Sequence, residues 1–188
     1  FGFGLKDSIS AIVPLQYEQI QLYDGDVILK EDVTEEERIE VQKELDTDKK
    51  VSVTAENLLK NIEVSSGESS QEVYLDVPKD VEAFKKFVVI RDRKTKEIYS
   101  LDDKGAILTE KAAKLLGVSV GDNLTINTDD GEKTVLISAI CENYMGHYLY
   151  MTSEVYEKTF GEAPAYNSIY YRTQDRTTEE AKDVGENV

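Results

Sequence analysis

Tryptophan is absent from the 188-residue chain, and cysteine and histidine each occur once. A single cysteine excludes an intramolecular disulfide, and it also excludes zinc sites built from several thiolates. With His147 as the lone histidine, one chain cannot supply a multi-histidine metal centre. Low cysteine content fits the cytosol and the outer face of bacterial membranes equally well.

Positive charge is also scarce, because 22 Lys and Arg residues oppose 38 Asp and Glu residues, for a formal net charge of −16. Nucleic-acid phosphates and anionic lipid headgroups would be repelled, so we expect neither as a partner. No apolar run approaches the ~20 residues of a membrane-spanning helix. The chain does contain 5 Phe and 11 Tyr, which indicates a folded core rather than a disordered chain.

Both ends of the chain carry a strand followed by a helix. Near the start, Ile20 and Leu22 alternate with polar residues, and Thr34 and Glu37 have the spacing of a capping box that opens a helix. Near the end, an apolar strand precedes a helix that begins at Thr178. We therefore expect strands at 17–29, from residue 50 and at 168–172, with helices at 34–46 and from residue 178.

The middle of the chain is richer in hairpins. Asp130-Gly131 is a two-residue hairpin signal, and Gly117 stands where a left-handed cap ends a helix. Residues 134–141 are apolar on both faces, which predicts a central strand. The pattern predicts strands at 72–77, 88–90, 97–101, 123–128, 134–141 and 149–151, helices at 78–86, 109–116 and 154–160, and a hairpin turn at 93–96.

This order of elements predicts an α+β fold with two lobes. The chain ends, residues 15–77 and 165–188, are expected to form a split βαβ layer in which the strand near 18–29 pairs with the strand at 168–172. Residues 78–164 are expected to form an inserted β-rich lobe with short helices.

One loop stands out as a candidate binding surface, because it gathers aromatic residues around the single histidine. We take Tyr144, His147 and Tyr148 as a candidate surface for a ligand or partner. The favoured alternative is a packed turn between two strands. Cys141 ends a buried strand and is expected to act as a small apolar residue.

The sequence shows no motif for catalysis, a cofactor or a metal. A catalytic histidine needs an orienting acid and a nucleophile, and no recognisable motif supplies them near His147. The acid clusters, such as Asp24-Gly25-Asp26, are too short for a calcium loop. The glycine-containing segment 117–122 follows a helix rather than opening one, so it does not form a phosphate loop.

Two stretches resemble a known family. The segment TEKAAKLLGVSVGDNLTI (109–126) resembles the helix–Gly–"xxGD"–strand unit of FtsX-like, MacB-type ABC transporter permeases, and the strand at 135–140 continues it. Residues 142–151, with Tyr156 and Phe160-Gly161, resemble large Gram-positive members. The segment Phe3 to Ile9 resembles the exit of their first membrane helix. The resemblance is good over residues 97–172 and weaker over 1–96.

The resemblance implies the extracellular domain of a permease in the cell membrane, with a fold like the MacB periplasmic core and no enzymatic activity. Residues 1–14 would be a juxtamembrane segment after a first transmembrane helix, and residues 177–188 would pack through Val184 beside an open sheet edge. A cytoplasmic ATPase would bind the membrane part. The domain would transmit conformational change and bind a peptide, a small-molecule substrate or an accessory protein. The alternatives are a free-standing cell-surface ligand-binding or adhesion module and a hydrolase that uses His147.

Overall fold

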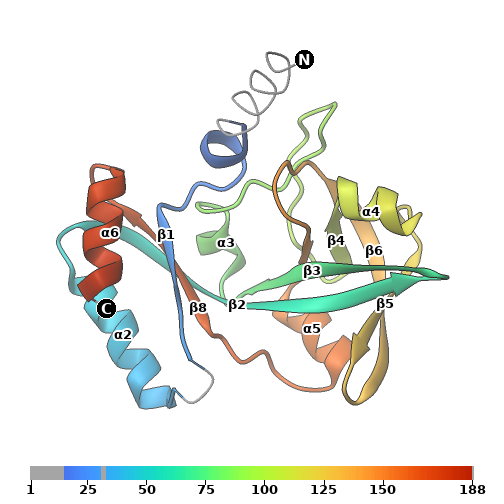
Figure 1. Cartoon of the computed structure of the whole chain (residues 1–188), viewed down its shortest axis with the longest axis horizontal. Coiled ribbons are helices and arrows are strands. Elements are labelled where there is room, and N and C mark those ends of the chain that lie inside the picture. Colours follow the sequence, from blue (N-terminus) through green and yellow to red (C-terminus); the bar gives the residue numbers. More distant parts are fainter. Residues whose placement is uncertain (1–14, 31–32, 188) are drawn as a thin grey trace, which may run out of the picture.

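The structure is a computed structural model that describes residues 15–30 and 33–187. Within these residues, eight strands form one mixed sheet in the order β1-β8-β2-β3-β7-β4-β6-β5, and helices pack around it (Figure 1). The predicted α+β class is therefore confirmed. The elements are β1 (Gly25–Ile28), α2 (Glu35–Thr47), β2 (Val51–Ser66), β3 (Ser69–Pro78), α3 (Val81–Phe84), β4 (Ala106–Thr109), α4 (Glu110–Leu116), β5 (Asn123–Thr128), β6 (Gly131–Cys141), β7 (Tyr148–Tyr150), α5 (Ser153–Phe160), β8 (Ser168–Thr173) and α6 (Thr178–Asn187).

Strand β2 organises the fold, because its 16 residues pair with three other strands. Its first part, residues 51–57, pairs with β8, and residues 57–66 pair with β3. Residues 63–65 pair with β5 on the edge that β8 occupies earlier. Since β5 returns to β2, the strands β2, β3, β7, β4, β6 and β5 close on themselves. We call these strands, with α4 and α5, the ring.

The chain ends meet in a second region. Strand β1 pairs antiparallel with β8, from Gly25 opposite Tyr171 to Ile28 opposite Ser168, and β8 pairs antiparallel with β2. Strands β1 and β2 are therefore parallel, with β8 between them and α2 connecting them, which is a split βαβ unit. We call β1, β8, residues 51–57 of β2, α2 and α6 the end layer. The predicted pairing of the two chain ends is confirmed.

The predicted strand at 17–29 is wrong in its first half. Residues 15–19 form a helical turn, Gln21 makes an isolated bridge with Val88, and regular pairing starts at Gly25. Gly25 lies against the Tyr171 ring so closely that an added Cβ would overlap the Tyr171 hydroxyl. Regular pairing with β8 therefore begins at a residue that has no side chain.

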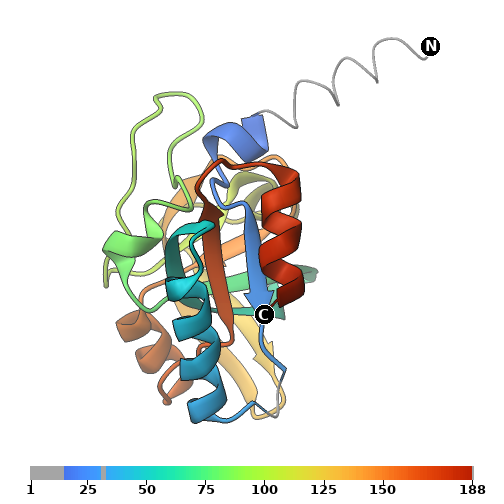
Figure 2. The same ribbon diagram turned by 90° about the vertical axis from the view of Figure 1, so that its left-hand side faces the viewer.

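Both faces of β8 are buried. Ile169 and Tyr171 point to one face, where they pack with Leu45 of α2 and Val184 of α6. Figure 2 shows α2 and α6 side by side over this face. Tyr170 points to the other face and packs with Phe84, Phe87 and other residues that precede β4. Val184 has no exposed surface, so the expected packing of the last helix through this residue is confirmed.

The ring contains the main core, and two of the sequence predictions within it are confirmed. Gly117 ends α4 in the left-handed conformation, with a φ of 69°. Strand β6 lies between β4 and β5, so it is central as predicted. The hairpin that joins β5 to β6 is present, but its loop is Asp129-Asp130, one residue earlier than expected, because Gly131 pairs with Thr128.

Residues 78–101 depart most from prediction. Helix α3 spans only Val81–Phe84, because Asp80 accepts hydrogen bonds from the amides of Glu82 and Ala83 and so caps the helix there. The expected strands at 88–90 and 97–101 are reduced to isolated bridges, including one between Arg91 and Ile98. The apolar residues that suggested strands, such as Val88 and Leu101, instead pack as a cluster against β8.

The sheet is continuous through both predicted lobes, since β2 and β3 pair with each other and with strands from residues 78–164. The predicted lobe boundaries stay a prediction. Residues 1–14, the predicted juxtamembrane segment, lie outside the described residues. In the part of the chain that the structure describes, no helix combines the length and the apolar character that crossing a bilayer requires.

Candidate functional site

The predicted surface residues Tyr144, His147 and Tyr148 lie at the junction of β6 and β7. A buried glutamine, Gln16, holds this junction to the start of the described chain. Its side-chain nitrogen donates to Asn143 Oδ1 at 2.9 Å, and its oxygen accepts the backbone amide of Tyr144, also at 2.9 Å. The neutral amide of Gln16 therefore couples the first helical turn to a loop more than 120 residues away.

Tyr144 belongs to a cluster centred on the Glu142 carboxylate, whose side chain has no exposed surface. Arg91 Nε donates to Glu142 at 2.6 Å, Lys96 Nζ donates at 2.8 Å, and the Tyr144 hydroxyl donates as well. Burial alone would raise the pKa of Glu142, but these donors outweigh burial and lower the pKa. Glu142 is thus a charged anchor for the loop.

His147 and Tyr148 are also held internally. The His147 carbonyl accepts the amide of Tyr74 at 2.8 Å, and burial together with nearby Lys111 lowers the pKa of the imidazole. The Tyr148 hydroxyl accepts from Gln21 at 3.0 Å, and its ring stacks on Tyr150. The structure therefore places Tyr144 and His147 in one loop and Tyr148 at the start of β7, and it gives each an internal contact. Their use as a partner surface stays a prediction.

A second polar site lies inside the molecule, at Asp76 of β3. Its carboxylate is fully buried and accepts hydrogen bonds from Asn57 Nδ2 at 2.7 Å and from the Tyr170 hydroxyl at 2.8 Å. Burial raises the pKa of Asp76 to about 7, although these two hydrogen bonds act in the opposite direction. Asp76 connects β2, β3 and β8, so it lies where the ring joins the end layer.

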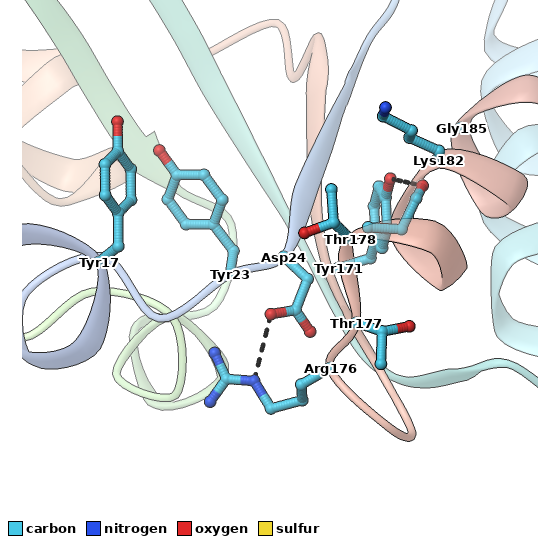
Figure 3. Close-up of a pocket in the computed structure, with 10 residues that line it drawn as sticks. Tyr17, Tyr23, Asp24, Tyr171, Arg176, Thr177, Thr178, Lys182 and Gly185 are labelled. Atoms are coloured by element: carbon cyan, nitrogen blue, oxygen red, sulfur yellow. Dashed lines mark hydrogen bonds and ion pairs between the residues drawn. The ribbon is translucent and has the colours of Figure 1, made fainter. Parts of the chain in front are cut away.

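A third site is a hollow of about 470 Å³ between the first and last described elements. Figure 3 shows Tyr17 and Tyr23 on one side, Asp24 in the centre and the C-terminal segment on the other side. Asp24 accepts from Arg176 Nε at 3.1 Å and from the Thr173 amide at 2.9 Å. Arg176 also donates to the Leu22 carbonyl at 2.9 Å. We call the contacts of Asp24 with Arg176 and Thr173 the chain-end junction.

The chemistry of these sites is that of binding and anchoring. The described residues contain no group of three or more His, Cys, Asp or Glu side chains placed to hold a metal ion. Cys141 is buried, and burial raises its pKa well above the ordinary range, so its thiol is poorly suited to act as a nucleophile. The Asp24–Arg176 pair joins two backbone segments rather than facing a nucleophile.

Sequence reasoning missed Gln16, Asp24, Asp76 and Arg176. Asp24 lies in the expected strand at 17–29, and its partner Arg176 is 152 residues away, so no local pattern could join them. Asp76 carried a usable signal, because it interrupts the apolar run Val73-Tyr74-Leu75-Asp76-Val77 in a strand that is buried near its end. A charged residue in such a run indicates a buried polar contact.

Comparisons with known proteins identify solved structures that share this fold. No protein-family model matches the chain, and no curated protein matches it by sequence. Among solved structures, the extracellular domain of the noncanonic ABC-type transporter YknZ from Gram-positive bacteria has a TM-score of 0.51 at 13% identity, and the match covers 88% of each chain. The chain therefore has the fold of that extracellular domain.

Two further solved structures are similar. The periplasmic region of MacB from Actinobacillus actinomycetemcomitans has a TM-score of 0.46 at 12% identity, covering 86% of this chain and 80% of that one. A domain of a protein assigned as a permease, from Porphyromonas gingivalis, has a TM-score of 0.43 at 13% identity, covering 87% and 73%.

Proposed function

We propose that this chain is the extracellular domain of an ABC transporter permease, and that it transmits conformational change rather than catalysing a reaction. The observation that carries the proposal is the fold shared with the YknZ extracellular domain over 88% of both chains. In this proposal the domain lies between the first and second transmembrane helices, and a cytoplasmic ATPase subunit binds the membrane part. The end layer acts as one mechanical unit and the ring as the other.

The chain-end junction supports a transmitting role. In a domain inserted between two membrane helices, movement of either helix reaches the domain through one end of the chain. Asp24 and Arg176 join the segments that follow the first end and precede the last, and Thr173 adds a backbone contact. A displacement of one segment would therefore be resisted by the other.

A second contact would carry motion from the first segment into the ring. Gln16 binds Asn143 and the Tyr144 amide, and these residues connect β6 to β7 of the ring. Both partners of Gln16 are held by further bonds, since Asn143 Nδ2 donates to the Met145 carbonyl at 2.7 Å and the Tyr144 hydroxyl donates to Glu142. The first helical turn is thus fastened to the ring, while Asp24, which follows it, is fastened to the C-terminal segment.

Location can be tested in intact cells that express the complete protein. We would place a cysteine at exposed Glu68, in the tight turn between β2 and β3, and treat the cells with a membrane-impermeant maleimide. We expect labelling of Glu68→Cys before lysis, whereas the buried native Cys141 stays unlabelled in folded protein. Labelling of Glu68→Cys only after lysis would overturn the extracellular assignment.

Transmission can be tested on the purified complex of the full protein with its ATPase. We expect Asp24→Asn to lower coupling between transport and ATP hydrolysis by about 5-fold, because it removes the charge that holds Arg176; this is the lower end of the usual range for coupling between sites. Glu97→Gln, on the exposed 93–97 turn, is the matched control. Equal coupling in both variants would contradict the transmitting role while leaving the location intact.

A further inference from the structure

A groove of about 790 Å³ lies beside β2, away from the sites described above. It opens between α2, which covers β2 near Glu56, and α5, which packs on the ring part of the same strand. Its volume is within the ~300–1,000 Å³ typical of ligand sites. The residues used below are Lys30, Arg38, Lys60, Lys79, Tyr156 and Tyr166.

The groove reverses the charge of the molecule. Its lining contains four cations but only two carboxylates, Glu35 and Glu162, whereas the whole chain has 22 cations against 38 acids. Two of the cations are already paired, since Arg38 binds Glu35 and Glu56, and Lys79 Nζ lies 2.6 Å from Glu56. Burial and nearby Arg38 lower the pKa of Lys79, as expected where positive charges are close together.

Lys60 occupies an unusual position. On β2, Leu58, Ile62 and Val64 face the core, and Lys60 stands in the same row because alternate residues of a strand share a face. Its ammonium donates to the Tyr156 hydroxyl at 3.3 Å and lies 5.4 Å and 5.1 Å from the ring centres of Tyr156 and Phe160. Among the described residues it forms no ion pair with a carboxylate. A cation in an apolar row, oriented by two rings, is available to an incoming anion.

The backbone beside Lys60 favours an extended ligand. On this edge of β2, pairing with β8 ends at Asn57, and pairing with β5 begins at Glu63. Between them, the backbone of Leu59 bonds to a side chain instead of a strand: its amide donates to Asn167 Oδ1 at 2.8 Å, and its carbonyl accepts from Asn167 Nδ2 at 3.0 Å. Within the described residues, positions 60–62 thus have no strand beside them on this edge. Extended peptides bind such edges through main-chain hydrogen bonds, and side-chain pockets give specificity.

We propose that this groove binds an extended, carboxylate-bearing segment of a partner protein, with Lys60 as its principal contact. Arg38, Lys30 and Lys79 supply the surrounding positive field, and Tyr156 and Tyr166 supply the apolar surface. The net charge of −16 repels acidic chains from the rest of the molecule, so an acidic segment is directed to the groove by charge. The proposal is independent of the extracellular permease assignment.

The test uses a fluorescein-labelled hexapeptide of alternating Asp and Glu, with an Asn/Gln hexapeptide as its neutral counterpart. Fluorescence anisotropy at low salt measures both affinities. We expect the acidic peptide to bind about 10-fold more tightly or better, and Lys60→Met to remove about 10-fold of that affinity, which is the value of one charged hydrogen bond. Lys114→Met, on exposed α4, loses the same charge outside the groove and should change affinity less than about 2-fold.

A second readout separates binding from folding. Lys60→Met completes the apolar row on β2, so its thermal midpoint should not fall even though binding does. Equal binding of both peptides, equal loss in the two Met variants, or no binding of the acidic peptide would overturn the proposal. Displacement of the peptide by succinate at equal affinity would also overturn it, because the ligand would then be a small anion rather than an extended segment.

Discussion

The ring and the end layer differ in how their strands are stabilised. The ring is closed by hydrogen bonds from β5 back to β2, and its core holds 19 buried side chains among the described residues. The helix-covered face of the end layer holds four, and β1 has β8 as its one strand partner in the described chain. Buried apolar area is the dominant source of stability, so the ring should be the more stable region.

This difference assigns different tasks to the two regions. A sheet that closes on itself leaves few free edge positions and resists opening, whereas a short edge strand under two helices can open at lower cost. The end layer also contains the chain-end junction, whose ion pair is partly exposed and therefore sensitive to salt. In the proposed transmitting role, the region that would receive displacement at the chain ends is thus the less stable one, and it is attached to the more stable ring.

A matched pair of substitutions gives the largest expected effect. Leu108 in the ring and Leu45 in the end layer are both fully buried, so each Leu→Ala change removes the same atoms. We expect Leu108→Ala to lower the free energy of unfolding by about 3 kcal/mol. We expect Leu45→Ala to act mainly on local opening of the end layer, as measured by hydrogen exchange. Equal exchange throughout the molecule in both variants would show that the two regions unfold as one.

The junction between the regions should respond to pH through Asp76. Its folded pKa of about 7 exceeds its unfolded value, so the folded protein binds the extra proton and stability falls as pH rises from about 4 to 7. Asp76→Asn should remove a slope of up to about 1.4 kcal/mol per pH unit from this range. Urea titrations of both proteins at several pH values measure the difference. A parallel pH dependence in the variant would mean that Asp76 is not the titrating group.

The smallest effect should come from the end layer itself. Gly185 lies inside α6, and a Cβ there would approach the Tyr171 hydroxyl no closer than 3.4 Å. Gly185→Ala should therefore stabilise the helix by about 0.5–1 kcal/mol through reduced chain entropy. Hydrogen exchange should slow in α6 and remain unchanged in β6. Slower exchange in the ring as well would contradict this expectation, because it would show that stabilising the end layer also stabilises the ring.

Local signals predicted the elements whose stability is local. The capping box at Thr34 and Glu37 is formed, and α2 spans Glu35–Thr47 against an expected 34–46. The left-handed cap at Gly117 is likewise formed. Prediction failed where tertiary contacts decide the backbone, as at residues 16–24, where Gln16 binds Asn143 and Gln21 binds Tyr148 of β7 instead of continuing a strand.

The candidate sites were less predictable, because their partners are far apart in the chain. Composition alone located the loop with Tyr144 and His147. Nothing in the local sequence distinguishes its anchor Gln16 from the many other polar residues. Lys60 could have been found once the register of β2 was known, because a lysine between Leu58 and Ile62 breaks the apolar row. Register depends on pairing with β3, β5 and β8, which a single strand does not specify.

The fastening of the first helical turn by Gln16 has a consequence for how the molecule behaves across environments. An amide neither ionises in the accessible pH range nor loses strength through ionic screening. The Asp24–Arg176 ion pair, in contrast, would weaken as the salt concentration rises, because dissolved ions screen its charges. The neutral contacts of Gln16 with Asn143 and Tyr144 would persist. The helical turn at residues 15–19 should therefore stay attached to the ring at salt concentrations that weaken the contact between Asp24 and Arg176.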